Sequence, residues 1–337
     1  MFLTTANEAE EVQYVVAYDL LDGRKLWQTE IHRGKFSRRH EKNSHASPTL
    51  AGDGEKVYAL FHHGDGLYVS AVNLDGSLAW QTKAGDYQVR HGAGASPAIH
   101  DSLVIVAGES KHDPFLAGLH RGTGDVVWKK TLRAEGWSFA SPVVANVAGR
   151  SQLLLASKHT VGSYDPNNGQ LIWQCRWPAV RVANSVVCNL DRVFACSTRY
   201  DPSILCVRAD GTGDVSDTHV LWQGSRGASY VPSPILNEKL LYIVSDDGVF
   251  TAFESETGHQ VYRQRLSGKF SASPLVAGDC IYMSNERGVT YVVKTGRTFE
   301  LIAQNDLGEP IFASPVVCNG RLLLRTERSL YCIGPDE

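Results

Sequence analysis

The chain has 337 residues, of which 43% are hydrophobic and 20% are charged, so it contains enough apolar material for a packed core. Its formal net charge of −3 excludes the strongly positive surface that non-specific binding to nucleic acid requires. No apolar run approaches the roughly 20 residues of a membrane-spanning helix, so the chain is not expected to span a membrane.

The first recurring element along the chain is a small residue followed by Ser-Pro and apolar residues. Its six complete copies are Ala46-Ser47-Pro48, Ala95-Ser96-Pro97, Ala140-Ser141-Pro142, Pro232-Ser233-Pro234, Ala272-Ser273-Pro274 and Ala313-Ser314-Pro315. A degenerate copy is Asn184-Ser185-Val186, and successive copies are 40 to 49 residues apart. That interval is the length of one four-stranded blade of a β-propeller.

A second element lies between these copies, and it consists of an apolar strand, a turn with glycine and a strand that contains an aromatic residue. Its clearest copies are Asp19 to Trp27, Leu74 to Trp80, Leu119 to Trp128 and Asp165 to Trp173. Trp222 and Tyr262 hold the aromatic position in the next two units, and Gly296 marks the last turn. Glycine permits the positive φ angle of a tight turn, and the aromatic side chain supplies apolar area for contact with the neighbouring blade.

The alternation of Ser-Pro with an Asp-to-Trp element, as in Asp19 to Trp27 and Asp165 to Trp173, resembles the PQQ-like propeller repeat over essentially the whole chain. The chain looks most similar to the repeat-only proteins related to the outer-membrane assembly lipoprotein BamB. The stretch from Lys42 to Pro48 also resembles an element of planctomycete-type PQQ-like proteins.

The repeats predict an all-β fold, an eight-bladed β-propeller of four-stranded antiparallel blades in a single domain over residues 1–337. The expected blade units are approximately 1–31, 44–84, 93–132, 138–177, 182–224, 230–266, 270–307 and 311–334. The first and last blades are expected to be incomplete, because the Ser-Pro copies and the glycine turns are out of phase. The two missing strands would precede Met1, so we expect a native form that extends upstream, with an export signal.

Functional residues are expected on the face formed by the connections before each Ser-Pro and between the second and third strands, here called the upper face. The candidates for ligand or partner binding are Arg39, His40, Lys42, Asn43, His45, His62, His63, Arg90, His91, Trp137, Arg181, Tyr230, Phe270 and Phe312. The aromatic members suit an exposed rim for protein recognition, and they would equally suit a plug of the central funnel.

Seven of the twelve histidines fall on the predicted upper face, within consecutive blades. Three interpretations remain open for them, namely a metal site, recognition of an anion or polar ligand, and solvated loop residues. The segment from His32 to Lys42 is the most basic stretch of the chain, and it is either a binding site for a carboxylate or phosphate or a solvated loop.

The sequence contains no adjacent cysteine pair and no GxSxG, HExxH or P-loop pattern, so no catalytic residue and no metal ligand is predicted. We do not expect bound PQQ despite the family name. The resemblance implies a non-catalytic protein-binding or scaffolding module, with an outer-membrane assembly component as partner and a periplasmic or secreted full-length form; a cytoplasmic location stays open. The alternative is a quinoprotein-type or metal-dependent enzyme that uses the histidine-rich upper face.

Overall fold

The computed structural model describes residues 1–110, 112–132, 138–198 and 200–334. All regular secondary structure in these residues is β-strand, and the strands form eight consecutive antiparallel sheets. The sheets are the blades of a β-propeller, which confirms the predicted fold class, and the first and last have three strands. The chain divides into two compact units, Met1–Gln174 and Cys175–Glu337, here called unit 1 and unit 2.

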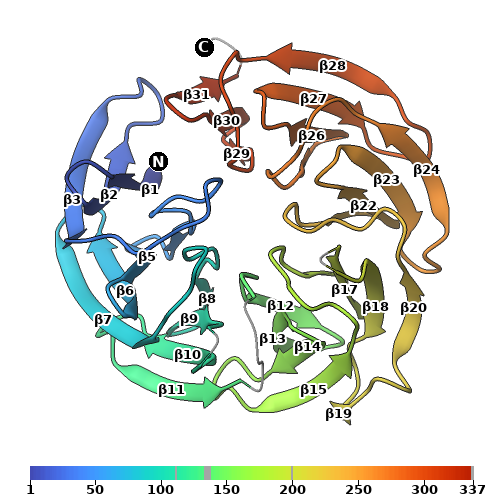
Figure 1. Ribbon diagram of the computed structural model, residues 1–337, viewed down its shortest axis with the longest axis horizontal. Coiled ribbons are helices and arrows are strands. Elements are labelled where there is room, and N and C mark those ends of the chain that lie inside the picture. The colour runs from blue at the N-terminus through green and yellow to red at the C-terminus, as the bar shows by residue number, and fades with distance from the viewer. Residues whose placement is uncertain (111, 133–137, 199, 335–337) are drawn as a thin grey trace. The chain divides into compact units, whose positions relative to one another are not determined.

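Unit 1 contains the first four sheets, which follow one another in Figure 1 from blue to green. Their strands are β1 (Phe2–Asn7), β2 (Val12–Tyr18), β3 (Lys25–Arg33), β4 (Ala51–Gly52), β5 (Lys56–His63), β6 (Gly66–Asn73), β7 (Leu78–Asp86), β8 (Ala98–His100), β9 (Leu103–Gly108), β10 (Phe115–His120), β11 (Val126–Thr131), β12 (Val143–Val147), β13 (Arg150–Ser157), β14 (Thr160–Tyr164) and β15 (Leu171–Arg176). Within each of these sheets the strands pair in their order along the chain, so each sheet is a meander.

Unit 2 contains the last four sheets, which run from olive to red in Figure 1. Their strands are β16 (Val187–Cys188), β17 (Arg192–Ser197), β18 (Ser203–Arg208), β20 (Val220–Gly224), β21 (Ile235–Asn237), β22 (Leu240–Val244), β23 (Val249–Glu254), β24 (Gln260–Arg265), β25 (Leu275–Ala277), β26 (Cys280–Ser284), β27 (Val289–Lys294), β28 (Leu301–Asp306), β29 (Val316–Cys318), β30 (Arg321–Arg325) and β31 (Leu330–Ile333). The two-residue strand β19 (Gly213–Asp214) lies between β18 and β20 in the chain. Within the described ranges, no helix is long and apolar enough to cross a membrane.

The serine of the Ser-Pro element joins neighbouring sheets. In unit 1 the Ser96 hydroxyl accepts a hydrogen bond from the Thr49 amide at 2.9 Å, and the Ser141 hydroxyl accepts one from the Ser96 amide at 2.8 Å. In unit 2 the amides of Ser185, Ser233 and Ser273 donate in the same way to the serine of the next sheet. A small polar side chain is needed here because it satisfies a main-chain donor at a crowded contact between two sheets.

The predicted role of the tryptophans in packing between blades is seen in their contacts. The Trp80 indole N–H donates to the Arg121 carbonyl of the next sheet at 3.0 Å, and a Cβ atom on Gly124 would lie 2.6 Å from the Trp80 ring. Trp128 makes the equivalent pair of contacts with Pro166 and Gly169. The ring therefore packs on the glycine turn of the next sheet and not on the face of that sheet.

Trp173 differs from these residues, because its indole N–H donates to Gln152 Oε1 within its own sheet at 2.8 Å. The side chain is fully buried. A buried indole N–H requires a hydrogen-bond acceptor, and here a buried glutamine supplies it.

Glu109 follows β9 and is a buried acid in the core of unit 1, with 2% of its surface exposed. Neither carboxyl oxygen has a hydrogen bond of standard geometry within the described residues. Burial raises the pKa of Glu109 to about 8, and the nearby hydroxyls of Ser157 and Ser138 offset only part of that effect. The carboxyl group is therefore protonated in the folded protein at neutral pH.

We predict that Gly169→Ala destabilises the protein far more than Gly23→Ala. The two glycines hold the same turn position with φ angles of +69° and +71°, so alanine costs about 1 kcal/mol of backbone strain at either site. At Gly169 the new methyl group would also lie 2.6 Å from the Trp128 ring, whereas no described atom lies within 4 Å of a methyl group at Gly23. Overpacking of this kind adds roughly 1–3 kcal/mol. Urea unfolding measures the difference, and equal midpoints for the two variants would show that the tryptophan contact does not constrain the turn.

We also predict that Glu109→Gln stabilises the protein at neutral and alkaline pH. The pKa of the buried carboxyl is above its ordinary value of 4.5, so unfolding releases its proton between pH 4.5 and 8 and the wild type loses stability as pH rises through that window. The gain from the neutral amide is on the order of 3 kcal/mol at pH 7 and vanishes below pH 4.5. Urea unfolding at pH 4.5, 6, 7 and 8 tests this, and a difference between variant and wild type that does not change with pH would contradict it.

Candidate functional site

Nine of the fourteen predicted site residues lie on three connections of unit 1. These are the segment 34–50 between β3 and β4, the end of β5 together with the turn to β6, and the segment 87–97 between β7 and β8. The nine residues are Arg39, His40, Lys42, Asn43, His45, His62, His63, Arg90 and His91. Four more lie in unit 2, and Trp137 lies outside the described residues.

Two amide side chains bring the three connections of unit 1 together. Gln13, on β2, donates through Nε2 to the His45 carbonyl at 2.6 Å and to the His62 carbonyl at 3.2 Å. Asn43 donates through Nδ2 to the carbonyls of His91 and Ala93, at 2.6 and 3.2 Å. The segment 34–50 is thus held in place by main-chain acceptors on both of its neighbours.

Arg39 forms an ion pair with another residue of unit 1. Its Nη2 lies 2.5 Å from Glu8 Oε1, and its Nε donates to the same oxygen at 3.0 Å. The arginine also donates to the carbonyls of His40 and Glu41. Its role is therefore to anchor the loop, and its charge is largely balanced.

The histidines of unit 1 occur in separate aromatic contacts. The His32 and His63 rings are stacked with centroids 4.6 Å apart, and the His40 and His91 rings are tilted at 5.8 Å. His45 stacks on Phe36 at 4.1 Å. Among the residues that the structure describes, no three His, Cys, Asp or Glu side chains gather as metal ligands.

Burial keeps the inner histidines neutral at pH 7. It lowers the pKa of His32 to about 4, with a further contribution from His63. Burial also lowers the pKa of His62, and it lowers that of His45 together with the charge of Arg39. Neutral imidazoles retain one N–H donor and one acceptor nitrogen each.

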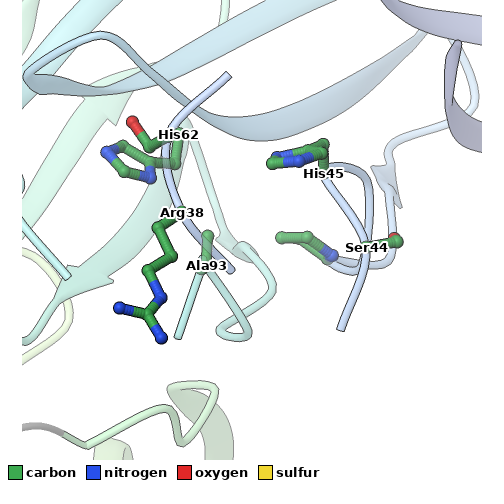
Figure 2. A pocket seen from close by; sticks show the side chains of 8 residues that line it. Arg38, Ser44, His45, His62 and Ala93 are labelled. Carbon is green, nitrogen blue, oxygen red and sulfur yellow. The ribbon is translucent and has the colours of Figure 1, made fainter. Parts of the chain in front are cut away.

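A shallow pocket that is open to solvent, with room for about one water molecule, lies at the junction of these connections (Figure 2). It is lined by Ser37, Arg38, Ser44, His45, Pro48, His62, Gly92 and Ala93. Figure 2 shows His45 and His62 on two sides of the pocket, with Arg38 beside His62. Two of the predicted residues, His45 and His62, thus share one cavity.

The sequence analysis missed two residues that matter to this site. Gln13 is fully buried, and its polar side chain inside the otherwise apolar strand β2 was a usable signal. His32, at the end of β3, was seen only as the start of the basic segment. Nothing in the sequence indicates that its ring stacks on that of His63.

The four unit 2 candidates have different environments. The Arg181 guanidinium lies 5.8 Å from the centroid of the Tyr200 ring, and the Tyr230 amide donates to Asp246 Oδ2 at 2.7 Å. Phe312 is partly exposed, at 37%. The expectation that Phe270 belongs to an exposed rim is wrong, because its side chain is completely buried in the core beside Tyr291.

A family model described as outer membrane protein assembly factor BamB matches residues 11–261 and 214–299. The BamB of Yersinia pestis is 23% identical over 331 residues, which cover 96% of this chain and 80% of the relative. The BamB of Legionella pneumophila is 27% identical over 208 residues, which cover 58% of this chain and 50% of that protein.

Among solved structures, BamB from Moraxella catarrhalis has a TM-score of 0.69 with 15% identity, over 96% of this chain and 90% of that one. A europium-containing methanol dehydrogenase has a TM-score of 0.67 with 11% identity, over 96% of this chain and 80% of the enzyme. At these identities the structural likeness shows the fold alone. The match of the family model over most of the sequence goes further, and the chain belongs to the family of outer membrane protein assembly factor BamB.

Proposed function

We propose that this protein is a non-catalytic scaffold that binds other proteins in outer-membrane assembly, and that it acts in the periplasm. The observation that carries the proposal is the extent of the likeness, because the match with an assembly factor covers 96% of this chain and 80% of that relative.

The quinoprotein-type alternative rests on fold likeness at 11% identity, and the same fold hosts unrelated functions. The relatives found by sequence are named as assembly factors. The proposal therefore follows the sequence relationship, with no bound cofactor and no catalytic residue assigned.

The surface that we assign to the partner is the junction of the three unit 1 connections, here called the junction surface. Its exposed basic residues are Lys35, Arg38, Lys42 and Arg90, and its exposed acidic residues are Glu41 and Asp65. The junction surface is thus basic on a chain with a net charge of −3, and a partner segment rich in acidic residues would complement it.

We predict that the triple variant Arg38→Glu, Lys42→Glu and Arg90→Glu loses its partner. The full chain, tagged and cross-linked in cells of its source organism, is expected to recover outer-membrane assembly components. The triple variant should recover about tenfold less, because reversed charges oppose the approach of an acidic surface.

The matched control reverses three exposed arginines of unit 2, Arg226, Arg263 and Arg265, and should recover as much as the wild type. Equal loss in both triple variants would indicate a non-specific charge effect and would overturn the assignment of the junction surface. Recovery of no assembly component by the wild type would contradict the proposed function. So would an absorption spectrum that shows stoichiometric binding of added PQQ with calcium.

A further inference from the structure

We infer that the pocket at the junction surface is a recognition site for a carboxylate, carried by an acidic side chain of a partner protein. The inference rests on the proposed function and names the chemistry that the partner brings. The groups that would face the carboxylate are those of Arg38, Ser44, His45 and His62.

The first argument is that the pocket holds polar groups that have no hydrogen bond of standard geometry within the described residues. The Arg38 side chain is exposed, and within the described residues it makes no ion pair and no hydrogen bond. His62 Nε2 is buried without a hydrogen-bond partner in the described part of the chain. A carboxylate oxygen would satisfy this nitrogen in the tautomer that carries the ring proton on Nε2.

The second argument is that three carboxylates of unit 1, apart from that of the exposed Glu41, are already engaged. Glu8 is held by Arg39, and Asp65 accepts a hydrogen bond from Lys83 Nζ at 3.0 Å. The Glu11 carboxylate accepts from the Phe36 amide at 3.4 Å. Within the described residues none of these three carboxylates pairs with Arg38, so its charge can face an acid of a partner protein.

The third argument is that the pocket is formed before any ligand arrives. The main chain at His45 and at His62 is fixed by the same Gln13 amide, and the His45 ring is stacked on Phe36. Gly92, at the pocket wall, has a φ angle of +82°, and a Cβ atom there would lie 2.7 Å from Asn43 Nδ2. A site fixed in this way loses little conformational entropy when it binds.

A carboxylate suits the pocket better than a larger anion. The planar guanidinium of Arg38 can donate two parallel hydrogen bonds to the two oxygens of a carboxylate. The pocket is small and open to solvent, so the end of an acidic side chain can enter while its main chain stays outside.

Binding of small probes to the full chain tests the inference. The probes are a blocked tripeptide with a central glutamate, the same tripeptide with glutamine, and inorganic phosphate. Ring signals of His45 and His62, assigned with single His→Asn variants, report binding by NMR. The glutamate peptide should shift both signals saturably, and the glutamine peptide should not.

The variant Arg38→Ala should weaken binding of the glutamate peptide about tenfold, since a hydrogen bond to a charged group contributes roughly 1.5–3 kcal/mol. The matched control Arg24→Ala removes another exposed arginine of unit 1 and should leave the affinity unchanged. Arg38→Lys keeps the charge without the planar fork, and we expect an intermediate affinity. Urea unfolding of each variant confirms that the fold is intact.

Three results would overturn the inference, namely no saturable shift, an equal response to the glutamine peptide, and binding of phosphate alone. Failure here is distinguishable from failure of the proposed function. One outcome is that the triple variant loses its partner while the glutamate peptide shifts neither histidine signal. The protein-binding role then stands and the pocket assignment falls. If Arg38→Ala weakens peptide binding while no assembly component is recovered by the wild type, the pocket stands and the proposed function falls.

Discussion

The structure depends on the contact between one sheet and the next, because a small four-stranded sheet cannot bury its apolar faces alone. Two devices repeat this contact within each unit. A serine hydroxyl accepts a main-chain N–H at the first strands, and a tryptophan packs on a glycine turn at the last strands. Glycine is required at these turns for two reasons. It adopts the positive φ angle of the turn, and it has no Cβ atom that would collide with the indole ring.

Because the packing residues lie within the strands and their turns, the connections are free to carry other chemistry. The segment 34–50 shows how a connection becomes ordered without regular secondary structure. Asn43 and Gln13 use main-chain carbonyls of neighbouring connections as fixed points, and Arg39 adds an ion pair with Glu8. The basic stretch that the sequence analysis described as either a binding site or a solvated loop thus contains an anchor and an unpaired arginine side by side.

Repeat spacing was enough to predict the class of fold and the number of blades, because the same contact must be made at the same position in each blade. The same reasoning did not predict the position of Phe270, which is buried. It lies four residues before Pro274, and the residues four before Pro97 and Pro315, Ala93 and Ile311, are also buried. The same position is exposed at Ser44 and half-buried at Tyr230, so comparison across the repeats does not assign Phe270 to the core, and its type alone suggested a binding residue.

Other features of the site were beyond the sequence because they depend on distances between segments. Arg38 and Arg39 are adjacent and chemically identical, yet among the described residues only Arg39 forms an ion pair. The histidines likewise are one residue type, but they form one stacked pair, one tilted pair and a stacked contact with Phe36. A function of this propeller must therefore be sought in the few groups that neither packing nor internal pairing uses, since packing residues serve any propeller equally. Within the described part of unit 1, the guanidinium of Arg38 is such a group, and it belongs to a residue that lines the pocket.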